Sequence, residues 1–269
     1  MSSRFFLMLQ YLAILVVAKV TMTDSDILYD QFAPHYRQYA RKRASYLSSI
    51  NNIIIADSRR ILPISKMLDI GSGEGERASR LKRKIGAKTL LMMESSQEMI
   101  DLCKVQKGEK KIKADITTLN CKKYTNKFDV ITCLWNVFGH ISSKSKRLIA
   151  LRQIKRMVRA NGRIYIDISN RYNMKYYGVK IVLFNIIHDI FKSENIYGKN
   201  GDFKYNIQLS KRKQIASSSH FFSKYEFDNL IHTAELAVVN TYYINYLDGN
   251  LEQSQFSGHL LYILERKVS

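Results

Sequence analysis

Three glycines in the segment 66–77, which reads KMLDIGSGEGER, constrain the fold of this 269-residue chain more than any other feature. The residues before them, 67–70, suit a buried parallel strand, and a helical pattern begins just behind them. Glycine is needed at such a turn because the backbone takes positive φ and approaches a ligand closely, where a Cβ would collide. The following helix presents unpaired N–H groups in its first turn. The segment therefore predicts a strand, a tight ligand-binding turn and a helix.

The spacing of these glycines distinguishes two kinds of nucleotide site. Gly71, Gly73 and Gly75 are two residues apart, whereas a dinucleotide turn reads Gly-x-Gly-x-x-Gly. Asp69 lies two residues before the first glycine, and a carboxylate so close to a pyrophosphate would repel it. The segment resembles the first motif of class I S-adenosylmethionine-dependent methyltransferases. That resemblance implies that the loop, with Ser72, holds the methionine end of the cofactor, and that the acid interacts with its amino group, usually through water.

Two further segments follow in the order that this family has. The run 89–94 reads as an apolar strand that ends in an acid, Glu94, about 20 residues after the glycine turn. A carboxylate at this strand end can accept both ribose hydroxyls of a nucleoside, and the resemblance places Ser95 beside it. The run 95–98 also has the pattern of a helix capping box, and the two roles are compatible. The resemblance further implies that Asp115 meets the adenine amino group and that Ile116 lies on the ring.

The segment 128–141, FDVITCLWNVFGHI, resembles the fourth motif of the family. In detail it is similar to the corresponding segment of glycine N-methyltransferase and its relatives, which reads Cys-Leu-Gly-Asn followed by a small residue and His. The resemblance implies cofactor contacts at Leu134 and Trp135. However, Trp135 stands where that subgroup has glycine, and its large indole would reshape the floor of the acceptor pocket. Glycine therefore cannot be carried over as the substrate.

Asn136 and His140 are the candidate catalytic residues. They lie four residues apart, so they share one face if this segment is helical. The amide of Asn136 can orient an acceptor without a particular protonation state, and His140 can take a proton from an amine near neutral pH. The alternative for His140 is a hydrogen bond to a neighbouring loop.

Polar and aromatic residues follow the fifth expected strand, at the edge where the methyl group should point. Residues gathered at the carboxyl end of a strand are well placed to bind a substrate. The candidates are Asn170, Arg171, Tyr172 and Tyr176. Residues 178–222 then look like an insertion, with an apolar helix at 179–191 and antiparallel strands around 203–207. We expect substrate specificity to reside in this insertion.

Tyr29 and Tyr36, near the start of the chain, lie seven residues apart and share one face of an expected helix. Methyltransferases of this class that act on small molecules often begin with a similar Tyr-Asp-x-x-Ala-x-x-Tyr pattern, whose aromatic rings close over the cofactor. An aromatic stripe that faces the core is the other interpretation.

The length fits one large α/β domain. The family resemblance, over residues 26–268, implies a Rossmann-like, seven-stranded, mostly parallel sheet with helices on both faces and an antiparallel last strand. A helix at 224–234 and strands at 238–246 and 259–264 would complete it. We expect residues 23–268 to form the methyltransferase domain.

Residues 1–22 differ from the rest of the chain, since Phe5 to Val20 form an apolar run broken only by Gln10 and Lys19. The run resembles a signal peptide or short anchor, but it is shorter than the roughly 20 residues that cross a bilayer, and no Ala-x-Ala cleavage site follows. A translation start at Met22 is a third interpretation. We favour that start or a membrane-associating tail over secretion. The three cysteines are too scattered for a disulfide framework, which favours a cytoplasmic location.

The net charge of +20 raises the question of nucleic acid. The lysines and arginines are spread over every helical segment, whereas an RNA surface more often forms a basic stripe with interleaved aromatics. The sequence therefore predicts a methyltransferase that uses S-adenosyl-L-methionine, without a metal, to methylate a nitrogen or oxygen of a small molecule. The alternatives are methylation of tRNA or another macromolecule, and a membrane-associated, non-catalytic binding protein.

Overall fold

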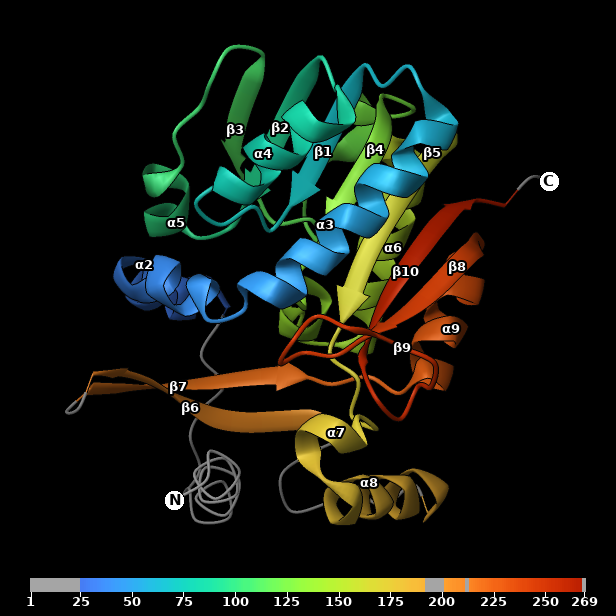
Figure 1. The fold of residues 1–269 in the computed structure, drawn as a ribbon. Helices are drawn as coiled ribbons and strands as arrows, with labels where there is room; N and C mark the ends of the chain where they lie inside the picture. The colour runs from blue at the N-terminus through green and yellow to red at the C-terminus, as the bar shows by residue number, and fades with distance from the viewer. Residues whose placement is uncertain (1–24, 192–200, 211–212, 268–269) are drawn as a thin grey trace.

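The computed structural model of the protein describes residues 25–191, 201–210 and 213–267 (Figure 1). Its centre is an eight-stranded sheet with the order β3-β2-β1-β4-β5-β10-β8-β9. The strands are β1 (Lys66–Ile70), β2 (Thr89–Glu94), β3 (Glu109–Lys113), β4 (Phe128–Cys133), β5 (Val158–Ile168), β8 (Leu236–Ile244), β9 (Leu251–Glu252) and β10 (His259–Arg266).

Strands β1 to β5 pair in parallel, and β10 runs antiparallel to both of its neighbours. This confirms the mostly parallel sheet and the antiparallel last strand. The described sheet has one strand more than expected because the link between β8 and β10 folds back on β8, where Glu252 pairs with Tyr243.

Helices cover both faces of the sheet. Helices α3 (Ala44–Ser58) and α4 (Glu76–Ile85) contribute to one core cluster, and α6 (Lys144–Met157) and α9 (Lys224–Thr233) contribute to the other. Adjacent residues of β4 show why the two clusters form: Val130 belongs to the first and Ile131 to the second. Successive side chains of a strand point to opposite faces, so a strand that is apolar throughout is buried on both.

A further layer lies across the carboxyl edge of the parallel strands (Figure 1). It contains α2 (Ser25–Arg41), α5 (Gln97–Leu102), α7 (Met174–Tyr177), α8 (Val179–Phe191) and the antiparallel hairpin β6 (Asp202–Ser210) and β7 (Lys213–His220). Short 3₁₀ turns η2 (Arg59–Ile61), η3 (Cys121–Tyr124) and η4 (Val137–His140) complete the elements. Helix α2 packs on α5, and β7 packs against both α2 and η4.

A local sequence signal explains where α5 begins. Ser96 caps α5, since its hydroxyl accepts a hydrogen bond from the Met99 N–H at 3.1 Å. The cap thus lies one residue later than the expected box that starts at Ser95. The apolar helix expected at 179–191 is α8.

Among the residues that the structure describes, no helix is long and apolar enough to span a membrane. The apolar run from Phe5 to Val20, and with it the question of the chain's first 22 residues, lies outside the described ranges.

Candidate active site

The glycine turn joins β1 to α4 as the sequence predicts. Gly71, Gly73 and Gly75 have φ angles of +68°, +56° and +76°, in the left-handed region that favours glycine. A Cβ on Gly71 would overlap the side chain of Val137, and one on Gly73 would lie 3.1 Å from the hydroxyl of Tyr36. The turn is therefore closely covered by η4 on one side and by α2 on the other.

Asp69 lies fully buried beneath this turn. Its carboxylate accepts hydrogen bonds from the Thr132 hydroxyl and from Nη2 of Arg77, the latter at 3.2 Å. The other terminal nitrogen of Arg77, Nη1, is buried and has no hydrogen-bond partner among the described residues. The turn thus offers a carboxylate for an ammonium group and an unused guanidinium N–H for a carboxylate, which are the two charged groups of an amino acid.

Arg77 was not among the predicted site residues. Its only sequence signal is its position in the first turn of the helix that follows the glycines, eight residues after Asp69.

Glu94 lies at the carboxyl end of β2, beside the turn. Its carboxylate accepts hydrogen bonds from the backbone N–H groups of Gly73 at 2.8 Å, Ser95 at 2.9 Å and Ser96 at 3.1 Å. Burial raises the pKa of Glu94, and these three hydrogen bonds oppose that rise. Glu94 therefore ties the glycine turn to the start of α5, while Ser95 contributes its backbone at this point.

Ser72, Asp115, Ile116 and Leu134 complete the predicted cofactor residues. The Ser72 hydroxyl donates to the carbonyl of Asp69 at 2.8 Å and so stiffens the turn. Asp115 is exposed just past β3, where it accepts from the Thr117 N–H at 2.7 Å, whereas Ile116 and Leu134 are buried in the two cores. Of these four, only Asp115 presents its side chain to solvent at the sheet edge.

The chain takes an unusual course directly after β4. Trp135 and Asn136 both adopt left-handed backbone angles, with φ of +70° and +57°, which bulky residues rarely do. Asp167, at the end of β5, holds this course: it accepts from the backbone N–H groups of Trp135 and Asn136 and from the Tyr46 hydroxyl at 2.8 Å. Asp167 is a positioning residue that the sequence motifs did not reveal.

Asn136 and His140 do not share an α-helical face, because the condition for it is not met. Left-handed Asn136 precedes a 3₁₀ turn, in which residues three apart, not four, are eclipsed. The side-chain oxygen of Asn136 accepts from the Ser169 N–H at 2.9 Å and links the ends of β4 and β5.

His140 contacts α2 instead of facing an open site. Its Nε2 lies 3.2 Å from the hydroxyl of Tyr29. Burial lowers the pKa of His140 to about 4, and a hydrogen bond with the backbone of Ser218 on β7 opposes that shift. The histidine is thus neutral near pH 7. It joins η4 to a helix, α2, and to a strand, β7, rather than to a neighbouring loop.

A cluster of aromatic rings surrounds Trp135 at this edge. The centre of its indole lies 5.4 Å from the ring of Tyr36 and 5.9 Å from that of Tyr39, on which it stacks. Its Nε1 donates to the hydroxyl of Tyr246 at 3.4 Å, and the ring of Tyr246 lies 5.2 Å from that of Tyr176. The structure therefore brings together three predicted residues, and it adds Tyr39 and Tyr246, which no sequence motif indicated.

The other three predicted substrate residues serve structural contacts. Asn170 is buried and donates to the carbonyl of Gly258 at 2.9 Å. Arg171 is buried between Asp189 at 2.8 Å and Glu226 at 2.6 Å. Tyr172 donates its hydroxyl to Asp189 as well. We therefore do not retain Asn170, Arg171 and Tyr172 as substrate contacts.

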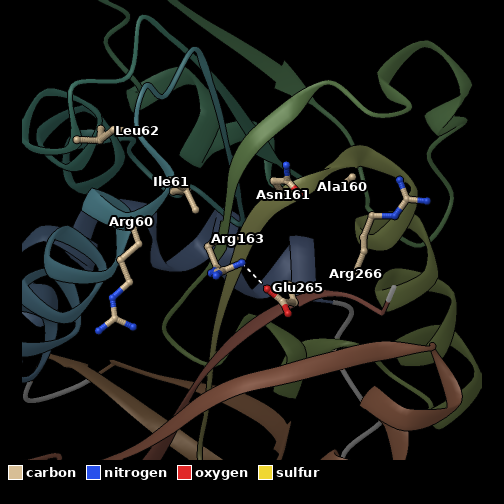
Figure 2. A pocket seen from close by; sticks show the side chains of 8 residues that line it. All are labelled: Arg60, Ile61, Leu62, Ala160, Asn161, Arg163, Glu265 and Arg266. Atoms are coloured by element: carbon tan, nitrogen blue, oxygen red, sulfur yellow. Dashed lines mark hydrogen bonds and ion pairs between the residues drawn. The ribbon is translucent and has the colours of Figure 1, made fainter. Parts of the chain in front are cut away.

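A hollow lies at the opposite edge of the sheet (Figure 2). Figure 2 shows Arg163 of β5 paired with Glu265 of β10 at 2.5 Å, with Arg60 and Asn161 nearby. Ligands of open parallel sheets bind outside the carboxyl ends of the strands, and this hollow is at the amino ends. It is therefore not the candidate active site.

Comparison with known proteins agrees with this geometry. The family profile described as a methyltransferase domain matches residues 68–166, a range that begins in β1, ends in β5 and includes the glycine turn. A search of curated protein sequences gives no match.

Solved structures share the fold along most of the chain. An S-adenosylmethionine-dependent methyltransferase from Clostridium acetobutylicum has a TM-score of 0.63 and 17% identity, over 90% of this chain and 100% of that one. An amino pentose methyltransferase from Micromonospora echinaspora, with S-adenosylmethionine bound, has a TM-score of 0.58 and 12% identity over 94% and 100%. The 1,6-didemethyltoxoflavin-N1-methyltransferase of Burkholderia thailandensis has a TM-score of 0.58 and 12% identity over 94% of each chain.

The resemblance of the fourth motif to glycine N-methyltransferase stays a prediction. The wider resemblance to class I methyltransferases is supported by the matched domain, by the shared fold and by a glycine turn whose neighbouring side chains suit the charged groups of an amino acid. Residues 68–166 therefore match a methyltransferase domain, and the fold around them is the one that these solved S-adenosylmethionine-dependent methyltransferases share.

Proposed function

We propose that this methyltransferase transfers the methyl group of S-adenosylmethionine to a nitrogen or oxygen atom of a small molecule. The observation that carries the proposal is the cover over the carboxyl edge, where β7 packs against both α2 and η4 and the His140–Tyr29 contact joins η4 to α2. Figure 1 shows α2 and β7 across that edge. A cover of this kind leaves a polymer little access to the glycine turn. Two of the structural neighbours above are named for small acceptors, an amino pentose and 1,6-didemethyltoxoflavin.

The donor groups at the turn fit S-adenosylmethionine. Asp69 suits its ammonium, the unused Nη1 of Arg77 suits its carboxylate, Glu94 suits the ribose hydroxyls and Asp115 suits the adenine amino group. When bound, the cofactor supplies an electrophilic methyl group on a sulfonium. The remaining residues proposed to line its site are Tyr29, Tyr36, Gly71, Ser72, Gly73, Gly75, Ser95, Ile116, Leu134 and Trp135.

The chain's own residues contribute mainly by positioning. Asp167 fixes the left-handed backbone at Trp135 and Asn136, and the aromatic cluster excludes water from the edge. Asn136 is proposed to orient the acceptor through its amide. We propose that neutral His140 acts through its contact with Tyr29, so that it holds the cover in place.

Methylation of tRNA or another macromolecule is the second candidate because of one observation. The net charge of +20 attracts polyanions over long range. Such attraction carries no information about the reacting atom, whereas the cover lies directly over the site.

A labelled-methyl assay separates the two candidates. The full chain is incubated with methyl-labelled S-adenosylmethionine and, in parallel, with the metabolite fraction and the RNA fraction of the source cell. The proposal expects label in the metabolite fraction, and loss of that transfer in Asn136→Ala with cofactor affinity nearly unchanged. Label that enters only RNA would establish the second candidate instead.

A further inference from the structure

Arg43, between α2 and α3, is a cation with no acidic partner in the part of the chain that the structure describes. Its guanidinium lies over the ring of Tyr246, with Cζ 4.4 Å from the ring centre. Among the described residues no carboxylate lies within ion-pair distance of it, and its Nε is buried without a hydrogen-bond partner. A partly buried guanidinium N–H that stays unpaired is costly, so its geometry favours an anion from outside the chain.

The groups around Arg43 are neutral. Burial raises the pKa of Tyr39, Tyr176 and Tyr246, and the positive charge of Arg43 opposes each rise. Burial and the same charge both lower the pKa of His259, to about 3. Four partly or fully buried side chains thus sense the charge of Arg43, and none of them neutralises it near pH 7.

A chain of contacts places Arg43 relative to the glycine turn. The Tyr36 hydroxyl lies against Gly73, the Tyr36 ring lies 5.4 Å from the ring of Trp135, and Trp135 donates to Tyr246, over which Arg43 lies. Trp135 therefore separates the turn that suits the methionine end of the cofactor from the guanidinium. The acceptor belongs on this side of the turn, at the edge where β4 and β5 end.

We propose that Arg43 binds an anionic group of the methyl acceptor, a carboxylate or a phosphate, so that the substrate class is an anionic small molecule. This inference rests on the proposed function above. A guanidinium matches both groups with paired N–H donors, and the net charge of +20 draws small anions toward the protein. The attacking nitrogen or oxygen of the acceptor would then lie over Trp135, with the anionic end beyond it.

The protein contains a natural reporter for this site, because Trp135 is the single tryptophan of the chain. Acetate and inorganic phosphate are titrated into the full chain, with and without S-adenosylmethionine, while its fluorescence is recorded. Sodium chloride at matched ionic strength is the reference. We expect a saturable change that chloride does not reproduce, and the anion that binds more tightly tells a carboxylate site from a phosphate site.

Matched variants assign that change to the residue. Arg43→Gln should weaken anion binding at least about tenfold, and Arg43→Lys should retain part of it. Arg41→Gln, an exposed arginine at the end of α2, should titrate like the parent. No saturable response in the parent, or an unchanged response in Arg43→Gln, would overturn the proposal.

Cofactor calorimetry separates this inference from the proposed function. Arg43→Gln should bind S-adenosylmethionine as the parent does, since Arg43 lies beyond Trp135. If the parent binds the cofactor and Arg43→Gln keeps its anion response, the acceptor assignment fails and the methyltransferase assignment stands. If the parent does not bind the cofactor, the proposed function itself fails.

Discussion

Among single residues, Glu94 has the most testable role, because one carboxylate accepts three backbone hydrogen bonds at the glycine turn. Glu94→Gln keeps the shape but points an N–H group at one of these donors. The loss of charged-acceptor hydrogen bonds, about 1.5–3 kcal/mol, should weaken S-adenosylmethionine binding by roughly 10 to 100-fold in calorimetry. Glu98→Gln, an exposed acid on α5, is the matched control.

The protonation of Glu94 should also make cofactor binding depend on pH. Burial raises the pKa of Glu94 above its usual 4.5, so acidification protonates it earlier than an exposed glutamate. Affinity should therefore decline as the pH falls toward that raised pKa, and the decline should be smaller in Glu94→Gln. A parent affinity that stays constant on acidification to pH 4.5 would remove Glu94 from the site.

The protonation of His259 should make the stability of the fold depend on pH. Its Nδ1 accepts a hydrogen bond from the Asn170 N–H at 2.9 Å, which only a ring unprotonated at that atom can do. Burial, and then the charge of Arg43, lower its pKa from 6.5 to about 3, so the folded state binds fewer protons than the unfolded state between these values. This contribution is complete above pH 6.5 and is lost as the pH falls toward 3.

The loss over that range is on the order of a few kcal/mol, since each pKa unit corresponds to about 1.4 kcal/mol. Melting temperatures measured across this pH range should fall steeply for the parent and less steeply for His259→Gln, which can still accept the Asn170 hydrogen bond. Equal slopes would show that other groups dominate the acid sensitivity.

Sequence patterns predicted residues whose role depends on the local chain and missed those whose role depends on distant contacts. The glycine turn, Asp69 and Glu94 follow from short-range order along one strand, turn and helix. Asp167, Arg43 and Tyr246 gain their surroundings from elements far apart in sequence. Arg171 shows the converse error, since its ion pairs with Asp189 and Glu226 could not be anticipated from the chain around it.

Among the elements, the β6–β7 hairpin depends on a charged network for its attachment. His220 on β7 lies between Asp202 of β6 at 2.6 Å and Glu226 of α9 at 2.8 Å. Glu226 also pairs with Arg171, which follows β5, at 2.6 Å. Burial would raise the pKa of Glu226, but hydrogen bonds to His220 and Arg171 hold that pKa at about 2. These contacts fasten the hairpin to the sheet beneath the cover.

Glu226→Gln should therefore destabilise the fold strongly. It leaves Arg171 and His220 with less negative charge in a largely buried setting, at a cost of about 3 kcal/mol. Urea unfolding measures the change. The pair of Lys155 and exposed Glu235 provides the control, and Glu235→Gln should leave the urea midpoint unchanged. Equal midpoints for the two variants would show that the network does not anchor the hairpin.

Sequence periodicity predicted which segments are helices and strands better than it predicted the backbone course of the turns between them. The apolar run at 179–191 predicted the range of α8, whereas the alternation at 203–207 predicted a strand but not the full length of β6. The turn after β4 was misjudged because its left-handed residues depend on Asp167, which comes from the next strand. Short β9 likewise exists only because the β8–β10 link folds back on β8.

For the whole molecule, the apolar run from Phe5 to Val20 lacks the periodicity of a core-packing helix face, so we propose that residues 23–268 fold without it. A chain that begins at Met22 should be soluble, melt cooperatively and bind S-adenosylmethionine like the full chain. Circular dichroism and calorimetry test this. Loss of cooperative folding on truncation would show that the run is part of the domain.

We propose that the carboxyl edge of the sheet, at the glycine turn, binds S-adenosylmethionine. A calorimetric titration of the cofactor into the full chain and into two variants, one at each edge of the sheet, tests this. We expect one cofactor per chain, binding lost or greatly weakened in Gly73→Ala, and binding unchanged in Asn161→Ala at the opposite hollow. Binding that survives in Gly73→Ala and disappears in Asn161→Ala would contradict it.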